Sequence, residues 1–224
     1  MNIKLVSKRQ EVEGVETFIL EPSEPVDWQP GQYMHYVFEH PNADDRGCER
    51  WFTIASAPFE KHLQITTRID GDPESSFKQA LNKLEIGQGF AADGPKGSFT
   101  LKQGDFKHIL IAGGIGITPY RSQLAQLAHD NQPANADLLY LNRDDNFVFG
   151  NELDGYAAKD PTLKIKKFVD KKLTAEDLKQ YADDPKSVLY LSGPRAMVEA
   201  YESMLGEDLK VAKDHIITDY FPGY

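Results

Sequence analysis

The sequence ILIAGGIGITP, residues 109–119, joins an aliphatic run to a glycine-rich turn. An unbroken aliphatic run is typical of a strand that is buried on both faces, as in a parallel sheet. Thr118 is a suitable helix N-cap and Pro119 suits the first helical position, so a helix is predicted to start there. Strand, turn and helix in this order form the repeating unit of a parallel α/β sheet.

The glycines of this turn have the properties of a phosphate-binding site. Gly113, Gly114 and Gly116 allow a ligand to approach the backbone, and the helix N-terminus offers free N–H groups and a positive dipole end. The pattern departs from G-x-G-x-x-G because Pro119 stands at the third glycine position, and the acidic ribose ligand expected about 20 residues further on is absent. A purely structural turn is therefore the alternative to a pyrophosphate site.

The residues beyond this stretch repeat the same alternation. Aliphatic runs predict further strands at residues 137–141, 163–168, 187–191 and 211–217, the second of them at a sheet edge. Helices are predicted to begin near Thr174 and at Pro194. We therefore expect an open parallel sheet in the second half of the chain.

The first hundred residues follow a different pattern. Short runs rich in β-branched and aromatic residues predict strands at 15–20, 32–38, 51–54 and 63–69, with turn residues between them. One helix is predicted at residues 75–84, where apolar residues recur at helical spacing. Many short strands at regular spacing indicate a barrel or a sandwich.

The composition excludes several classes of function. The chain has 224 residues, and 35 acidic against 25 basic residues give a net charge of −10, which disfavours nucleic acid and anionic membranes as partners. Because Cys48 is the single cysteine, the chain alone cannot hold a disulfide framework, a cysteine zinc site or an iron–sulfur cluster. The histidines show no metal-ligand spacing, so no metal site is expected. No apolar segment could span a bilayer and no signal-peptide block opens the chain, so we expect a soluble, cytoplasmic protein.

A second candidate site lies at residues 50–53, which read RWFT. An arginine on a strand can clamp a phosphate, and Arg50 and Phe52 share one face of that strand. Thr53 comes next along the strand and supplies a hydroxyl. The alternative is a surface arginine beside a core aromatic strand.

Five segments in a fixed order resemble the ferredoxin–NADP reductase-like flavoprotein family. They read GQY at 31–33, RWFTIAS at 50–56, GPKGSF at 94–99, GGIGITP at 113–119 and SGP at 192–194. The resemblance implies a fold of class α/β plus all-β. An N-terminal antiparallel flavin-binding β-barrel, residues 1–104, would precede a parallel-sheet, Rossmann-like NAD(P)-binding domain, residues 105–224.

In the first domain the resemblance implies a set of FAD contacts. Arg50 would bind the flavin pyrophosphate, Phe52 would pack on the ring system or the ribityl chain, and the Thr53 hydroxyl would reach flavin N5. Ser75 and Ser76 open a helix whose N-terminus favours phosphate, with simple capping as their alternative role. The implied FAD-binding residues are Arg50, Trp51, Phe52, Thr53, Arg68, Ser75 and Ser76.

In the second domain the resemblance implies an NAD(P) site. Ser192 stands near the expected nicotinamide, where many relatives have cysteine. Arg143 favours a 2′-phosphate whereas Asp144 and Asp145 oppose one, so NADPH, which we favour, and NADH both stay open. The implied residues are Gly113, Gly114, Gly116, Thr118, Asn142, Arg143, Ser192, Gly193 and Pro194.

The aromatic C-terminal tail is the last implied part of the site. Relatives often use such an aromatic to cover the flavin face that the nicotinamide must reach, and it would swing aside during reaction. Phe221 is the first candidate and Tyr224 the second, with a tail that merely packs on the sheet as the alternative. The implied catalytic residues are Thr53, Ser192 and Phe221.

The resemblance implies a flavin-dependent oxidoreductase. It would move hydride from NAD(P)H to bound FAD and then pass electrons to a separate acceptor, a ferredoxin- or flavodoxin-type carrier. The alternatives are a reductase for free flavin or quinone and an electron-transfer subunit of a larger complex. A basic cluster could dock an acidic carrier, although a solvated edge is the default interpretation; it consists of Lys164, Lys166, Lys167, Lys171 and Lys172.

Overall fold

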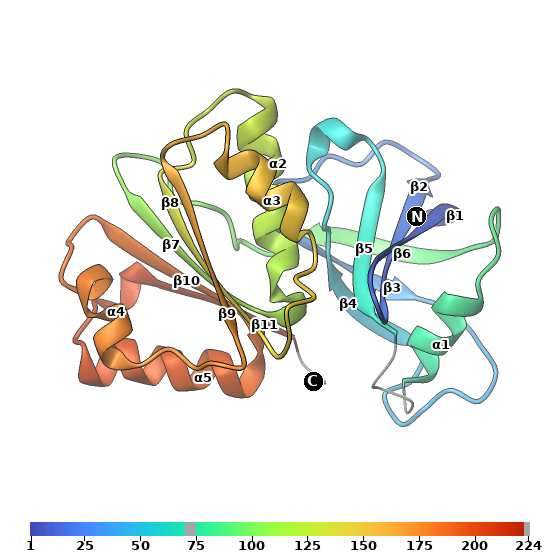
Figure 1. The fold of residues 1–224 in the computed structure, drawn as a ribbon. Coiled ribbons are helices and arrows are strands. Elements are labelled where there is room, and N and C mark those ends of the chain that lie inside the picture. Colours follow the sequence, from blue (N-terminus) through green and yellow to red (C-terminus); the bar gives the residue numbers. More distant parts are fainter. Residues whose placement is uncertain (70–74, 222–224) are drawn as a thin grey trace. The chain divides into compact units, whose positions relative to one another are not determined.

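The computed structural model describes residues 1–69 and 75–221, the last two without their side chains. The chain forms two compact units, Met1–Ser98 and Phe99–Tyr224 (Figure 1). The division falls a few residues before 104 because Phe99 packs within the second unit. Its ring centroid lies 5.7 Å from those of both Tyr120 and Tyr190.

The first unit is an antiparallel half-barrel, as predicted. Its six strands lie in the order β4-β3-β6-β1-β2-β5, and every pair in the sheet is antiparallel. The strands are β1 Asn2–Val12, β2 Val15–Pro22, β3 Tyr33–Val37, β4 Glu49–Thr53, β5 Leu63–Arg68 and β6 Gly89–Lys96. The predicted helix is α1, Ser76–Lys83, which buries Phe77 and Leu81 in the core beneath the sheet.

The second unit is the predicted parallel α/β sheet. Its strands lie in the order β11-β10-β7-β8-β9, so β9 is at an edge, as expected. The strands are β7 Lys107–Gly113, β8 Ala136–Asn142, β9 Leu163–Val169, β10 Ser187–Pro194 and β11 Ile216–Phe221. The helices are α2 Thr118–His129, α3 Gly150–Ala157, α4 Ala175–Ala182 and α5 Arg195–Ser203.

Alternate residues of these strands form two apolar layers. Ile109 and Leu189 face the side that α4 and α5 cover, where they join Leu178 and Val198 in one cluster. Figure 1 shows α2 and α3 on the opposite side of the sheet. Among the helices of the described residues, none is long and apolar enough to cross a bilayer.

Two local predictions were wrong. Thr118 is not an N-cap, because a 3₁₀ turn, Gly114–Ile117, runs directly into α2. The Thr118 hydroxyl instead donates a hydrogen bond to the Ile115 carbonyl oxygen at 3.1 Å. The last strand does not start at residue 211. A short turn, Lys213–His215, comes first, and β11 then begins at Ile216.

Candidate functional site

The strand order of the second unit indicates where a ligand would bind. From β7 the chain runs outward through β8 to β9, and it then returns on the other side of β7 as β10. In open α/β sheets, ligands bind at the carboxyl ends of the strands where the strand order reverses. Here that point lies between β7 and β10, which end at Gly113 and Pro194.

The glycine-rich turn after β7 packs tightly against the end of β10. A Cβ atom on Gly116 would lie 2.2 Å from the carbonyl oxygen of Ser192. A Cβ atom on Gly193 would lie 3.1 Å from Gly113 Cα, and Gly193 also has φ +154°, which side chains rarely adopt. The structure therefore brings the predicted residues of both strand ends together. Packing requires glycine at Gly116, whereas at Gly193 close packing and the positive φ together favour it.

Ser192 lies beside a carboxyl group that the sequence pattern did not single out. Ser192 and Asp219 are register partners on β10 and β11. Ser192 Oγ is buried and has no hydrogen-bond partner among the described residues. Burial raises the pKa of Asp219 to about 6. An orphaned hydroxyl and a buried carboxyl with a raised pKa are both typical of ligand sites, and the sequence signal was an acidic residue in an aromatic tail.

Asn142 organises the loop that follows β8. Its side-chain amide donates to the carbonyl oxygens of Asp144 and Asn146 and to Asp144 Oδ1, each at 3.1 Å. Arg143 is exposed next to it. Gly114 has φ +52°, and the nearest atom that a Cβ there would meet is Asn142 Oδ1 at 3.9 Å. Gly114 is therefore the glycine of the turn that has open space for a ligand beside it. This space faces the Asn142 side chain.

In the first unit, Arg50 lies on β4 and one carboxylate holds its guanidinium group. Nη2 donates to both oxygens of Asp44 at 2.9 Å. Nη1 donates to the carbonyls of Arg46 and Gly47 at 3.0 Å and of Glu49 at 2.6 Å. The Arg50 side chain is only 13% exposed, so its position is well defined.

The same Asp44 carboxylate caps the N-terminus of α1. Its oxygens accept the backbone N–H groups of Ser76 and Arg46, each at 2.9 Å. Partial burial raises the pKa of Asp44, but these hydrogen bonds and the Arg50 charge outweigh it, so the pKa lies well below its usual range. Arg50 and a helix N-terminus thus converge on one anion, an arrangement that also fits a phosphate.

The two serines at the start of α1 have different roles. Ser75 is the N-cap, and its hydroxyl accepts the Lys78 N–H at 3.5 Å. The Ser76 hydroxyl accepts the Asp44 N–H at 2.9 Å and bonds to His40 Nε2 at 2.8 Å. Ser75 thus has the capping role named as its alternative, whereas Ser76 lies next to Arg50's partner.

The other predicted residues of β4 point in different directions. Phe52 is 9% exposed and lies in the core, with its ring centroid 5.8 Å from that of Phe77. Trp51 is 43% exposed and stacks on His35 at 4.3 Å. Thr53 is 4% exposed, and its hydroxyl forms no hydrogen bond with the described residues. The structure therefore separates Trp51 from Phe52, since successive residues of a strand face opposite sides.

The remaining predicted residues lie at element ends. Arg68 ends β5 and is partly buried. The backbone of Phe221 pairs with that of Pro194, the N-cap of α5. The side chain of Phe221 and the whole of Tyr224 lie outside the described residues.

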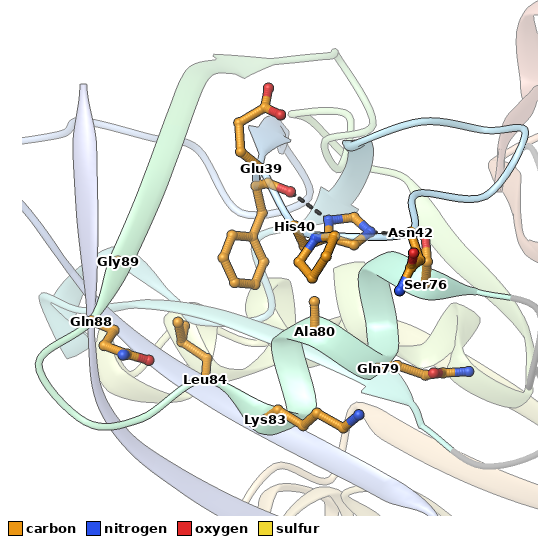
Figure 2. A pocket seen from close by; sticks show the side chains of 12 residues that line it. Glu39, His40, Asn42, Ser76, Gln79, Ala80, Lys83, Leu84, Gln88 and Gly89 are labelled. Carbon is orange, nitrogen blue, oxygen red and sulfur yellow. Dashed lines mark hydrogen bonds between the residues drawn. The ribbon is translucent and has the colours of Figure 1, made fainter.

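A cavity of about 710 Å³ lies beside α1 in the first unit (Figure 2). Figure 2 shows His40 reaching Ser76 at one end of it, while Gln88 and Leu84 lie at the other end. Of the predicted site residues, Ser76 borders it. The full lining is Phe38, Glu39, His40, Pro41, Asn42, Ser76, Gln79, Ala80, Lys83, Leu84, Gln88 and Gly89.

The basic cluster lies on and just after the edge strand β9. Lys167 Nζ is 2.6 Å from Asp154 Oδ2, and Lys171 Nζ is 3.8 Å from Asp177 Oδ1. Acidic neighbours therefore offset part of the local positive charge. Carrier docking at this cluster stays a prediction.

Comparisons with known proteins bear on the fold and on the domain family of the second unit. Residues 110–203 match the model of the oxidoreductase NAD-binding domain family. The 2-halobenzoate 1,2-dioxygenase electron transfer component of Burkholderia cepacia is 28% identical over 209 residues, covering 86% of this chain and 58% of that protein. A flavohemoprotein of Candida albicans is 28% identical over 197 residues, covering 79% and 48%. The chain thus spans about half the length of the curated relatives it matches.

Solved structures share the fold over nearly the whole chain. The flavohem-like FAD/NAD-binding domain of nitric oxide dioxygenase from Vibrio cholerae has a TM-score of 0.82 at 20% identity, covering 98% of both chains. Ferredoxin–NADP⁺ reductase from Plasmodium falciparum has a TM-score of 0.79 at 18% identity, covering 98% of this chain and 95% of that one.

An antiparallel half-barrel followed by a five-stranded parallel sheet is the fold that this chain shares with these solved structures. The resemblance is therefore confirmed at the level of the fold, and residues 110–203 match the oxidoreductase NAD-binding domain family.

Proposed function

We propose that this chain is an NAD(P)H-dependent flavoprotein reductase that binds FAD and delivers electrons to a separate acceptor. A bound flavin supplies the redox chemistry, since it accepts a hydride and can release electrons singly or in pairs. The observation that carries the proposal is the convergence of Arg50 and the N-terminus of α1 on one anionic group, on a chain that also has an NAD-binding domain.

In the first unit each proposed role follows from a contact. The Arg50 guanidinium and the Ser76 N–H would bind the flavin pyrophosphate, because both already bind an anion. The Thr53 hydroxyl is available to donate a hydrogen bond to flavin N5. Phe52 would support β4 from the core, whereas Trp51 and Arg68 stay predicted contacts.

In the second unit the proposed NAD(P) site follows the carboxyl ends of β7, β8 and β10. The backbone of Gly114 would approach the pyrophosphate, and Asn142 would meet the adenosine end. Ser192 and Asp219 would lie by the nicotinamide, where the orphaned Ser192 hydroxyl gains a partner. Arg143 and Asp144 would set the choice between NADPH and NADH by charge.

The proposed acceptor is a protein carrier of the ferredoxin or flavodoxin type. The names of several relatives support a protein acceptor, since they are electron transfer components of dioxygenases. Small-molecule acceptors such as free flavin or quinone are the alternative.

A reconstitution experiment tests the proposed function. The purified chain is incubated with FAD, freed of excess flavin and assayed with NADH and NADPH against ferredoxin, flavodoxin, free FMN and a quinone. We expect a yellow protein whose coenzyme oxidation is fastest with a protein carrier. A chain that binds no flavin would overturn the proposal, and fastest turnover with free FMN or quinone would replace the carrier with a small acceptor.

A further inference from the structure

Asp44 occupies the place that the proposed function assigns to a flavin phosphate. Its two oxygens accept hydrogen bonds from Arg50 Nη2 and from the Ser76 N–H at the start of α1, all at 2.9 Å. An arginine fork and a helix N-terminus are the donors that phosphate oxygens prefer. The carboxylate therefore uses the donors that a pyrophosphate would need.

We propose that the loop of residues 40–47 is an autoinhibitory latch, in which Asp44 closes the anion seat of the free chain and flavin must displace it to bind. The proposal rests on the proposed function, because it takes that seat to be the FAD pyrophosphate site. Asp44 would thereby set how tightly the chain retains flavin.

The contacts of the loop suit a segment that can detach. From Glu39 to Glu49 no residue of the loop is buried. Polar contacts hold it to α1, through Asp44 and through the bond between His40 and Ser76. The cavity of Figure 2 borders the loop between Phe38 and Asn42, so the loop is not packed solidly on that side. Detachment would therefore expose little apolar surface.

Charge repulsion prevents the Asp44 carboxylate and a flavin phosphate from binding to Arg50 and the Ser76 N–H at the same time. The pKa of Asp44 lies well below its usual range, so this carboxylate is ionised at neutral pH. A phosphate on the same donors would stand within a few ångströms of it, where like charges repel strongly at a partly desolvated site. Binding of flavin at Arg50 thus requires the Arg50–Asp44 pair to separate.

A positioning role for Asp44 is the competing explanation, and it predicts the opposite effect. In that case Asp44 would orient Arg50 for the phosphate, and its loss would weaken flavin binding. The structure favours the latch because the Glu49 carbonyl, on β4 itself, already accepts Arg50 Nη1 at 2.6 Å. Arg50 therefore keeps an anchor on its own strand without Asp44.

Titration of the flavin-free chain with FAD separates these explanations. We expect Asp44→Asn to lower the Kd about 10-fold or more, which corresponds to about 1.4 kcal/mol. Asp45→Asn, the same charge change at the exposed neighbouring position, should alter it less than about 2-fold. In an Arg50→Ala background, Asp44→Asn should give a smaller tightening, because the carboxylate then releases the Ser76 N–H but not the Arg50 guanidinium.

The outcomes distinguish failure of the latch from failure of the proposed function. An equal or higher Kd for Asp44→Asn overturns the latch while FAD binding by the unaltered chain upholds the proposed function. Absence of FAD binding by both chains overturns both. Hydrogen exchange on the unaltered chain tests the latch without a variant. FAD should speed exchange at the Asp44 and Arg46 amides, and unchanged or slower exchange there contradicts it.

Discussion

Arg50 and Thr53 have different proposed roles, one in flavin binding and the other in turnover. Arg50 is nearly buried and holds an anion through a charged fork, so its proposed role is flavin affinity. The Thr53 hydroxyl has no partner among the described residues and carries no charge, so its proposed role is a hydrogen bond to the reacting atom. Each role predicts a different kinetic effect.

Arg50→Ala should raise the FAD Kd about 10- to 100-fold, since hydrogen bonds to charged groups contribute about 1.5–3 kcal/mol. Thr53→Ala should keep the flavin content and slow reduction by NAD(P)H in stopped-flow measurements about 10-fold or more. Arg9→Ala on β1, which removes an exposed arginine paired with Glu11, is the matched control. Normal flavin content and normal reduction in both variants would refute these assignments.

Asp219 links the second site to the pH dependence of stability. Burial raises its pKa to about 6, above the usual value of about 3.9. A carboxyl with a raised pKa contributes stability below its unfolded pKa, and that contribution is lost as pH rises through about 6.

Asp219→Asn should therefore be more stable than the unaltered chain at pH 8, by on the order of 2 kcal/mol in urea unfolding. The difference should shrink towards zero near pH 4, where both side chains are neutral. Asp208→Asn, at an exposed position of the same unit, should leave the pH profile unchanged. A variant that is less stable than the unaltered chain at pH 8 would contradict the burial argument.

At the scale of elements, the turn between β7 and α2 depends on contact with the end of β10. Gly116→Ala would place a Cβ atom 2.2 Å from the Ser192 carbonyl oxygen. Because that oxygen belongs to the backbone of β10, the turn or the strand would have to shift to relieve the clash. We expect a loss of about 1–3 kcal/mol in unfolding free energy and weaker NAD(P)H binding. The matched control is Gly155→Ala on α3, where a Cβ meets nothing within 4 Å and should stabilise by about 0.5–1 kcal/mol. Equal stability of the two variants would refute this account of the turn.

Element patterns in the sequence predicted most of the fold but not all of it. The aliphatic run before Gly113 and the capping box at Thr174 each belong to one element, so local sequence is enough to identify them. Strand β1 gave no clear signal, because register shifts at Leu5/Ser7 and Gln10/Val12 interrupt its alternation. Helix α3 contains Gly155 and starts at Gly150, and both glycines weaken its helical pattern.

The candidate site was predictable where one segment carries the chemistry. Thr53 and Ser192 come from short motifs whose strands the pattern identifies. Asp44 and Asp219 were not identified because their surroundings arise only from folding. Folding brings Asp44 to the Ser76 N–H, which is 32 residues away in sequence, and strand pairing places Asp219 opposite Ser192. Long-range contacts of this kind have no local sequence signature.

For the whole molecule, an acidic chain with an NAD-binding domain and a half-barrel is proposed to reduce flavin and pass electrons on. It spans about half the length of its curated relatives, so the identity of the acceptor belongs to the proposal and not to the fold. The transfer from NAD(P)H to bound FAD is the step on which every other assignment depends.

Anaerobic reduction of the FAD-loaded chain measures that step directly. The loaded chain is mixed with NADH or NADPH in a stopped-flow instrument, and the absorbance of the oxidised flavin is followed. We predict rapid bleaching by at least one coenzyme, with the ratio of the two rates giving the preference set by Arg143 and Asp144. A flavin that stays oxidised with both coenzymes would contradict the account.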